Sequence, residues 1–128
     1  MLDLMLPASK MVAVTEFGYY VMGKKATKNE AMVAMALEHE EVEFLFQYWY
    51  QGGREILGGY VLDFLVFAPT GIPVEVFGEY WHSGLMASGD RYKIAVLTQA
   101  FGVEPVVIWG NESDTYELAL AAVRKKVI

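Results

Sequence analysis

The chain has 128 residues, of which 55% are hydrophobic and 20% charged, and its formal net charge is −6. This composition excludes an intrinsically disordered chain, and the absence of cysteine excludes disulfide bonds and thiolate-ligated zinc. The excess of 16 Asp and Glu over 10 Lys and Arg argues against a protein that coats nucleic acid through its charge alone.

Residues 1–26 show no clear helical pattern, and we expect an irregular arm or extra strands there, ahead of a single domain over residues 27–128. The sequence TKNE at residues 27–30 predicts the start of the first helix, because Thr27 can cap the helix and Glu30 can reach back to the cap. The helix then continues through apolar residues at helical spacing, namely Ala31, Ala34, Met35 and Leu37.

Three strands are expected after this helix. Aromatic and β-branched residues dominate residues 42–50, 60–67 and 72–78, and turns containing glycine or proline separate these segments. The segments are shorter than most helices of a protein core, and they follow one another along the chain as antiparallel strands do.

The rest of the chain predicts a helix over residues 90–101 that ends at Gly102, a strand over 106–109 and a last helix over 116–127. Asp114 and Glu117 have the spacing of a second capping box. The order of helix, three strands, helix, strand and helix predicts a mixed α/β domain built on one sheet.

Two acidic residues interrupt apolar strands. Asp63 lies within YVLDFLVF, and Glu75 lies within IPVEVFG on the following strand. If the turn between the strands has an odd length, both carboxylates point to the same face and nearly face each other. Such a pair repels unless it shares a proton or a cation, and two oxygen ligands completed by water suit magnesium better than zinc. The alternative is a hairpin with both acids in water on an exposed face.

Three further residues have a chemical and a structural interpretation. His82 could be oriented by a neighbouring carboxylate, or it could be a structural or surface histidine. Asp90 could be a site residue or the cap of the helix that begins there. Glu30 could be a site residue, although its capping box already explains it.

Taken together, these segments resemble a known family. GGYVLDF, VEVFGEYWH, DRYK and GVEPVVIWGNE, following the glutamate of the first helix, are similar to the very-short-patch-repair endonuclease branch of the PD-(D/E)XK nucleases. That branch includes phage homing endonucleases whose pattern is Glu, Asp, a variable position, His and Asp. The resemblance covers residues 27–127 and implies a restriction-endonuclease-like core of helix, three antiparallel strands, helix and strand.

The resemblance implies a role for each matched residue. Asp63 matches the metal-binding aspartate, Glu30 the first-helix glutamate and His82 the histidine that follows tryptophan. Asp90 matches the acid that begins the next helix, and Glu75 matches the acidic position of the superfamily's E-x-K element.

The sequence also departs from the family pattern. Phe77 occupies the position of the superfamily lysine, so the role of that lysine must fall elsewhere, and His82 is the first candidate. The structural zinc site of the repair enzymes is missing because the chain has no cysteine. A sequence-reading domain like that of the homing enzymes is also missing from these 128 residues.

The resulting expectation is a DNA endonuclease that depends on Mg²⁺ or Mn²⁺. Asp63 and Glu75 would hold the ion, which polarises the scissile phosphate and lowers the pKa of bound water. His82 would act on the attacking water or the leaving oxygen, and Asp90 would orient its imidazole. Phosphate contacts are expected from cations near these elements in sequence, namely Arg54, Arg91 and Lys93, and Lys24, Lys25 and Lys28 could extend that surface.

Two other classes stay open. One is a catalytically inactive member of the same fold that binds DNA or a protein, which Phe77 and the acidic net charge favour. The other is a small-molecule enzyme, for which no matching motif is present. We expect no membrane partner, because no apolar run approaches the ~20 residues of a spanning helix, and we expect a cytoplasmic location, in the host if a phage encodes the protein. Binding should be weak and salt-sensitive, so a second copy or a separate domain would have to add affinity.

Overall fold

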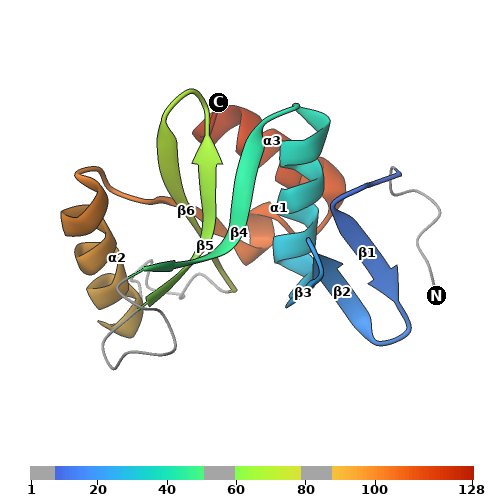
Figure 1. Ribbon diagram of the computed structural model, residues 1–128, viewed down its shortest axis with the longest axis horizontal. Coiled ribbons are helices and arrows are strands. Elements are labelled where there is room, and N and C mark those ends of the chain that lie inside the picture. Colours follow the sequence, from blue (N-terminus) through green and yellow to red (C-terminus); the bar gives the residue numbers. More distant parts are fainter. Residues whose placement is uncertain (1–7, 51–59, 79–87) are drawn as a thin grey trace.

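The computed structural model describes residues 8–50, 60–78 and 88–128, which form helices and two β-sheets (Figure 1). The first sheet is small and antiparallel, in the order β1-β2-β3, and consists of β1 (Val12–Thr15), β2 (Gly18–Val21) and β3 (Lys24–Ala26). Residues 12–26 therefore form three strands joined by tight turns.

Helix α1 (Lys28–His39) begins as the sequence predicts. Thr27 Oγ1 accepts a hydrogen bond from the N–H of Glu30 at 3.1 Å, and the Glu30 carboxylate accepts one from the N–H of Thr27 at 2.8 Å. Every residue from Ala31 to Leu37 is buried, whereas the spacing of the apolar residues predicts one buried face. Because residues 31–37 are apolar on every side of the helix, this segment can be enclosed on all sides.

The second sheet has four strands in the order β4-β5-β6-β7. Strands β4 (Glu43–Tyr50), β5 (Tyr60–Phe67) and β6 (Gly71–Phe77) are antiparallel neighbours, and β7 (Val106–Trp109) pairs with β6 in parallel. Parallel neighbours need a long crossover connection, and helix α2 (Ser88–Phe101) lies in the chain between β6 and β7. The predicted mixed α/β class is confirmed, and the three-stranded sheet is additional to the one sheet expected.

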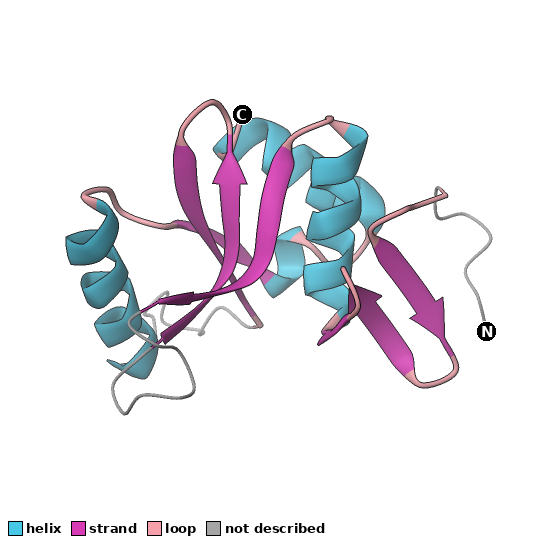
Figure 2. Cartoon of the chain, viewed as in Figure 1, coloured by secondary structure: helices cyan, strands magenta, loops and turns pink. Residues whose placement is uncertain are grey.

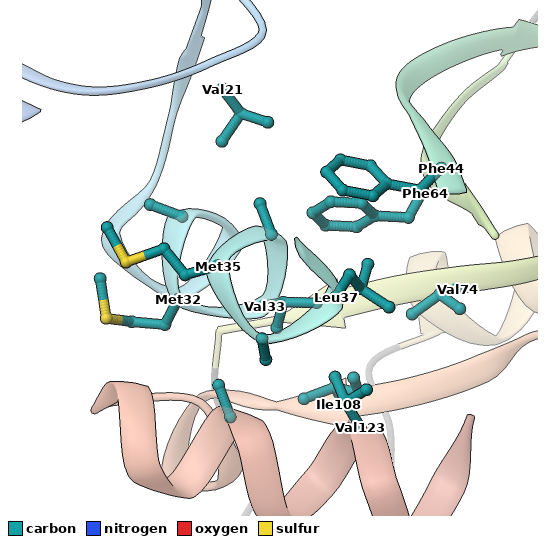
Figure 3. Packing of buried hydrophobic residues seen from close by; sticks show 14 of the residues in the cluster. Val21, Met32, Val33, Met35, Leu37, Phe44, Phe64, Val74, Ile108 and Val123 are labelled. Atoms are coloured by element: carbon teal, nitrogen blue, oxygen red, sulfur yellow. The ribbon is translucent and has the colours of Figure 1, made fainter. Parts of the chain in front are cut away.

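One hydrophobic core joins the two sheets to helices α1 and α3 (Figure 3). The rings of Phe44 on β4 and Phe64 on β5 meet edge to face, with centroids 5.5 Å apart, on the side of the sheet that faces α1. Val12 and Val21 of the small sheet belong to the same buried cluster. Helices α1 and α3 lie side by side (Figure 2), so the small sheet and α3 together enclose α1.

Helix α2 lies apart from the other two helices (Figure 1). Its Leu97 is fully buried and packs with Leu62 and Leu65 of β5 in a separate small cluster. Successive side chains of a strand point to opposite faces, so Leu65 points away from Phe64 and the α1 core. Helix α2 therefore packs against β5 in a cluster separate from the α1 core.

Helix α3 (Tyr116–Lys126) follows a short 3₁₀ helix over Gly110–Glu112. Its N-cap is Thr115, whose side-chain oxygen accepts a hydrogen bond from the N–H of Leu118 at 3.2 Å. The capping box predicted for Asp114 and Glu117 is therefore wrong, because the hydroxyl of the intervening threonine makes the capping bond. None of the helices in the described part of the chain is long and apolar enough to cross a membrane.

Candidate functional site

Asp63 and Glu75 lie opposite each other where the pairing of β5 with β6 ends. The last paired residues are Phe64 and Val74, and Asp63 and Glu75 come next in the same register. Here the side chains of the two acids accept hydrogen bonds from the backbone in place of strand pairing. Glu75 Oε2 accepts one from the N–H of Asp63 at 3.1 Å, and Asp63 Oδ2 accepts one from the N–H of Val76 at 2.8 Å. The structure thus brings together the two acids that the sequence placed on one face.

The pairing on the other side of Asp63 is interrupted as well. The paired residues of β4 and β5 skip Gln47 and Asp63, and β4 changes direction along its length (Figure 1). Gln47 has a φ of 55°, a left-handed conformation that residues with a side chain rarely adopt. Backbone strain of this kind concentrates at functional sites, where the surrounding structure holds it in place. The pairing of β5 with both of its neighbouring strands, β4 and β6, is therefore interrupted at Asp63.

The partner of Glu75 is a lysine from helix α2. Lys93 Nζ lies 2.5 Å from Glu75 Oε1, and the exposed fractions of the two side chains are 25% and 0%. Glu75 Oε1 has no hydrogen bond of favourable geometry, so the charge of the nearby ammonium is what stabilises this buried oxygen. The contact also fixes α2 against the face of the sheet that carries the two acids.

The environment of Asp63 strongly disfavours its charged form. The pKa of Asp63 is raised to about 8, first by burial and then by the charge of Glu75 and a hydrogen bond with that carboxyl. The positive charge of Lys93 and the N–H of Val76 lower the pKa but do not compensate. At neutral pH the pair therefore retains a proton unless another cation approaches it.

Glu30, at the start of α1, belongs to the same electrostatic cluster. Burial raises the pKa of its carboxyl, hydrogen bonds with Thr27 lower it, the charge of Asp63 raises it, and Lys93 lowers it. Glu30 therefore caps α1, and its pKa also depends on the charges of Asp63 and Lys93. Residues from α1, β5, β6 and α2 contribute to one cluster of three acids and one lysine, which we call the Asp63 cluster: Glu30, Asp63, Glu75 and Lys93.

Phe77, which the resemblance places at the position of a lysine, is a packing residue. It is 8% exposed, and its ring lies against that of Trp109 with centroids 5.6 Å apart. Lys93 instead supplies an ammonium group next to Glu75. The sequence predicts that Lys93 contacts phosphate. It does not predict the ion pair with Glu75, because the two residues lie on different elements. The lysine in DRYK was the only local signal.

The other candidate residues are placed less completely. His82 and Arg54 lie outside the described residues. Helix α2 begins at Ser88, so Asp90 lies in its first turn and is not its cap, and the position of the Asp90 side chain is outside the described part of the structure. Arg91 is exposed on the same turn, as a phosphate contact must be.

The donor set of the Asp63 cluster fits a magnesium or manganese ion. Mg²⁺ is commonly held by one or two carboxylates and keeps several of its waters, and Asp63 and Glu75 are two carboxylates in mutual contact. A divalent cation would also favour the ionised form of Asp63, which burial and the charge of Glu75 disfavour. Within residues 8–50, 60–78 and 88–128, no group of three His, Asp or Glu side chains is close enough to hold a metal ion.

No protein-family model, no curated protein and no solved structure matches the chain.

Proposed function

We propose that the protein is a DNA endonuclease of the PD-(D/E)XK type that depends on a divalent metal ion. The observation that carries this proposal is the contact of Asp63, Glu75 and Lys93 at the break in the four-stranded sheet. An acid pair beside a lysine is the donor set that phosphodiester hydrolysis uses, because carboxylates hold a hard cation and an ammonium group stabilises negative charge.

Asp63 and Glu75 would hold the ion in this mechanism. The chemistry that a divalent ion supplies at such a site is polarisation of the phosphate and a lower pKa for bound water. The raised pKa of Asp63 adds a requirement, because its carboxyl must lose a proton before it can act as a ligand.

Lys93 would take the part that the superfamily gives to the lysine missing at Phe77. Its Nζ contacts Glu75 and a quarter of its side chain is exposed, so it can reach a phosphate oxygen while it remains paired. An ammonium group in that position stabilises the charge that develops on the phosphate. The place of Lys93 supports an active nuclease over a catalytically inactive member of the fold, for which Phe77 had been the main argument.

The remaining roles follow from the resemblance alone. His82 would exchange a proton with the attacking water or the leaving oxygen, and Asp90 would orient its imidazole. Glu30 would support the nucleophile through water, and its raised pKa and its coupling to Asp63 are consistent with a position beside the ion.

The test is cleavage of supercoiled plasmid by the purified protein with Mg²⁺ or Mn²⁺, compared with the Asp63→Asn variant. A Lys125→Met variant serves as the control, because Lys125 is an exposed cation in the last turn of α3, an element that contributes no residue to the Asp63 cluster. We expect nicked and linear products from the wild type and the control and none from Asp63→Asn. Failure to cleave plasmid, linear, branched or single-stranded DNA with either ion, or equal cleavage by Asp63→Asn, contradicts the proposal.

A further inference from the structure

A shallow groove lies between the turn that joins β2 to β3 and the outer strand β4. Its volume is about 450 Å³, and its lining is Met22, Lys24, Leu45, Phe46, Gln47 and Tyr48. Three of its larger apolar side chains are well exposed: Met22 at 44%, Leu45 at 41% and Tyr48 at 38%. The groove therefore combines apolar and aromatic surface with a cation, and none of its described lining residues is a carboxylate.

The groove is next to the Asp63 cluster. Gln47 lines it, and Gln47 stands opposite Asp63 in the register of β4 and β5, at the place where their pairing is interrupted. Neighbouring strands are about 4.8 Å apart, so one strand spacing separates the groove's wall from the backbone of Asp63. A ligand in the groove would lie beside the proposed cleavage site.

Lys24 lines the groove, and two further lysines follow it in the chain toward Glu30. Lys24 and Lys25 on β3 and Lys28 at the start of α1 follow one another along the segment that leads to Glu30. None of the three makes an ion pair with a carboxylate of the described residues. Lys24 Nζ donates one hydrogen bond to the carbonyl of Phe46 at 3.1 Å, and the other two N–H groups of its ammonium can contact an anion.

A β-strand is a poor fit for this groove. Outer strands of sheets invite pairing with another chain, and proteins prevent it with lysine side chains and local distortions of the strand. Both features occur here, because Lys24 binds the Phe46 carbonyl on β4 and the next residue, Gln47, has a positive φ. Strand addition by a second copy of the chain is disfavoured, whereas an anionic ligand that presents flat apolar groups fits the lining.

We propose that this groove binds an unpaired nucleotide strand beside the cleavage site, with Tyr48 stacked on a base and Lys24 and Lys28 in contact with phosphates. Single-strand binding sites combine a basic track with aromatic side chains that stack on bases. The inference rests on the proposed nuclease for the identity of the neighbouring site, but it concerns binding and needs no turnover. It favours substrates with a single-stranded segment next to the cut.

The experiment is fluorescence anisotropy with fluorescein-labelled oligothymidylate and an abasic oligonucleotide of the same length, in EDTA over a series of salt concentrations. Tyr48→Ala should weaken binding of oligothymidylate about tenfold, with an unchanged salt slope and little effect on the abasic strand. Tyr48→Phe should bind like the wild type. Lys24→Met and Lys28→Met should each weaken both ligands and reduce the salt slope by about 0.7, whereas Lys125→Met should retain the wild-type slope.

Several outcomes would overturn the inference: no binding by the wild type, wild-type affinity in Tyr48→Ala and both lysine variants, or equal loss for the two ligands in Tyr48→Ala. A smaller mass of Tyr48→Ala in sedimentation would identify the groove as an interface between copies of the chain and would also overturn it. Thermal unfolding of each variant separates loss of binding from loss of folding. Because the assay contains no metal, a folded protein that binds as described but cuts no DNA contradicts the nuclease alone.

Discussion

Lys93 on helix α2 lies 2.5 Å from the carboxylate of Glu75, which is fully buried on the central strand β6. The ion pair connects the helix of the crossover between β6 and β7 to the break in the sheet. It also gives the acid pair a fixed cation on one side. Stability and proposed chemistry therefore depend on the same contact.

The first prediction concerns loss of this cation. Lys93→Met should lower the free energy of unfolding by about 2–4 kcal/mol, because it leaves Glu75 buried without a partner. The double variant Lys93→Met/Glu75→Gln should recover much of that loss, since the unpaired charge is gone. Urea denaturation measures both effects.

Cleavage assays on the same variants separate structure from chemistry. If Lys93 only holds α2 in place, the double variant should recover cleavage together with stability. We expect that it recovers stability and stays inactive, and that Lys93→Arg keeps the fold with reduced activity, because guanidinium and ammonium groups differ in geometry. Full activity in Lys93→Met would remove the lysine from the mechanism.

The second prediction follows from the raised pKa of Asp63. The pKa is about 8 in the folded protein against 3.8 for the ordinary carboxyl, so the unfolded state releases its proton first as the pH rises. The stabilising effect of protonated Asp63 is complete below 3.8 and is lost as the pH rises through about 8. Asp63→Asn should therefore be more stable than the wild type at neutral and alkaline pH, by about 1–2 kcal/mol.

Thermal unfolding at a series of pH values measures this difference, which should shrink toward the ordinary pKa of 3.8. Mg²⁺ should raise the melting temperature of the wild type, because it binds the folded state, and should not change that of Asp63→Asn. An Asp63→Asn variant that is less stable than the wild type at every pH would show that the carboxylate serves the fold.

The local sequence was sufficient to predict most elements of the fold. The capping box of Thr27 and Glu30, the positive φ of Gly102 after α2 and the strand at residues 60–67 depend on neighbours in the chain. The strands of the small sheet pair only with one another over residues 12–26, and extra strands are one of the two expectations for that segment. Residues 31–37 are all apolar, which is typical of a helix enclosed on every side, and the prediction of one buried face rests on only four of them.

The candidate site divides in the same way. Asp63 and Glu75 stood out because a carboxylate within an apolar strand is costly, and alternation along two joined strands placed them together. The contact of Lys93 with Glu75 and the distortion at Gln47 could not be predicted, because each depends on how a helix or an outer strand meets the sheet. The sequence alone therefore does not show which residue could replace the lysine that the resemblance places at Phe77.

The third prediction comes from the resemblance and concerns His82, which lies outside the described residues. His82→Ala should reduce the rate of DNA cleavage about 100-fold or more, the contribution of a positioned acid or base, while the Mg²⁺ concentration for half-maximal activity changes little. His82→Gln is a useful companion, since it keeps hydrogen bonding and cannot transfer a proton. A rate within twofold of the wild type in both variants would exclude the histidine from the mechanism.

The last prediction concerns two glycines at the ends of neighbouring strands. A Cβ added to Gly110, just after β7, would lie 1.9 Å from the carbonyl oxygen of Gly78, just after β6. A Cβ on Gly78 meets no atom of the described residues within 4 Å. Neither glycine has a positive φ, so only the close approach of the two strand ends distinguishes them.

Gly110→Ala should lower the free energy of unfolding by about 2–3 kcal/mol, because a backbone neighbour cannot rotate away. Gly78→Ala should change it by less than about 0.5 kcal/mol, and chemical denaturation of the matched pair measures the difference. Equal stabilities would mean that the ends of β6 and β7 do not approach as closely as the structure shows, and the position of Trp109 against Phe77, beside Glu75, would then need revision.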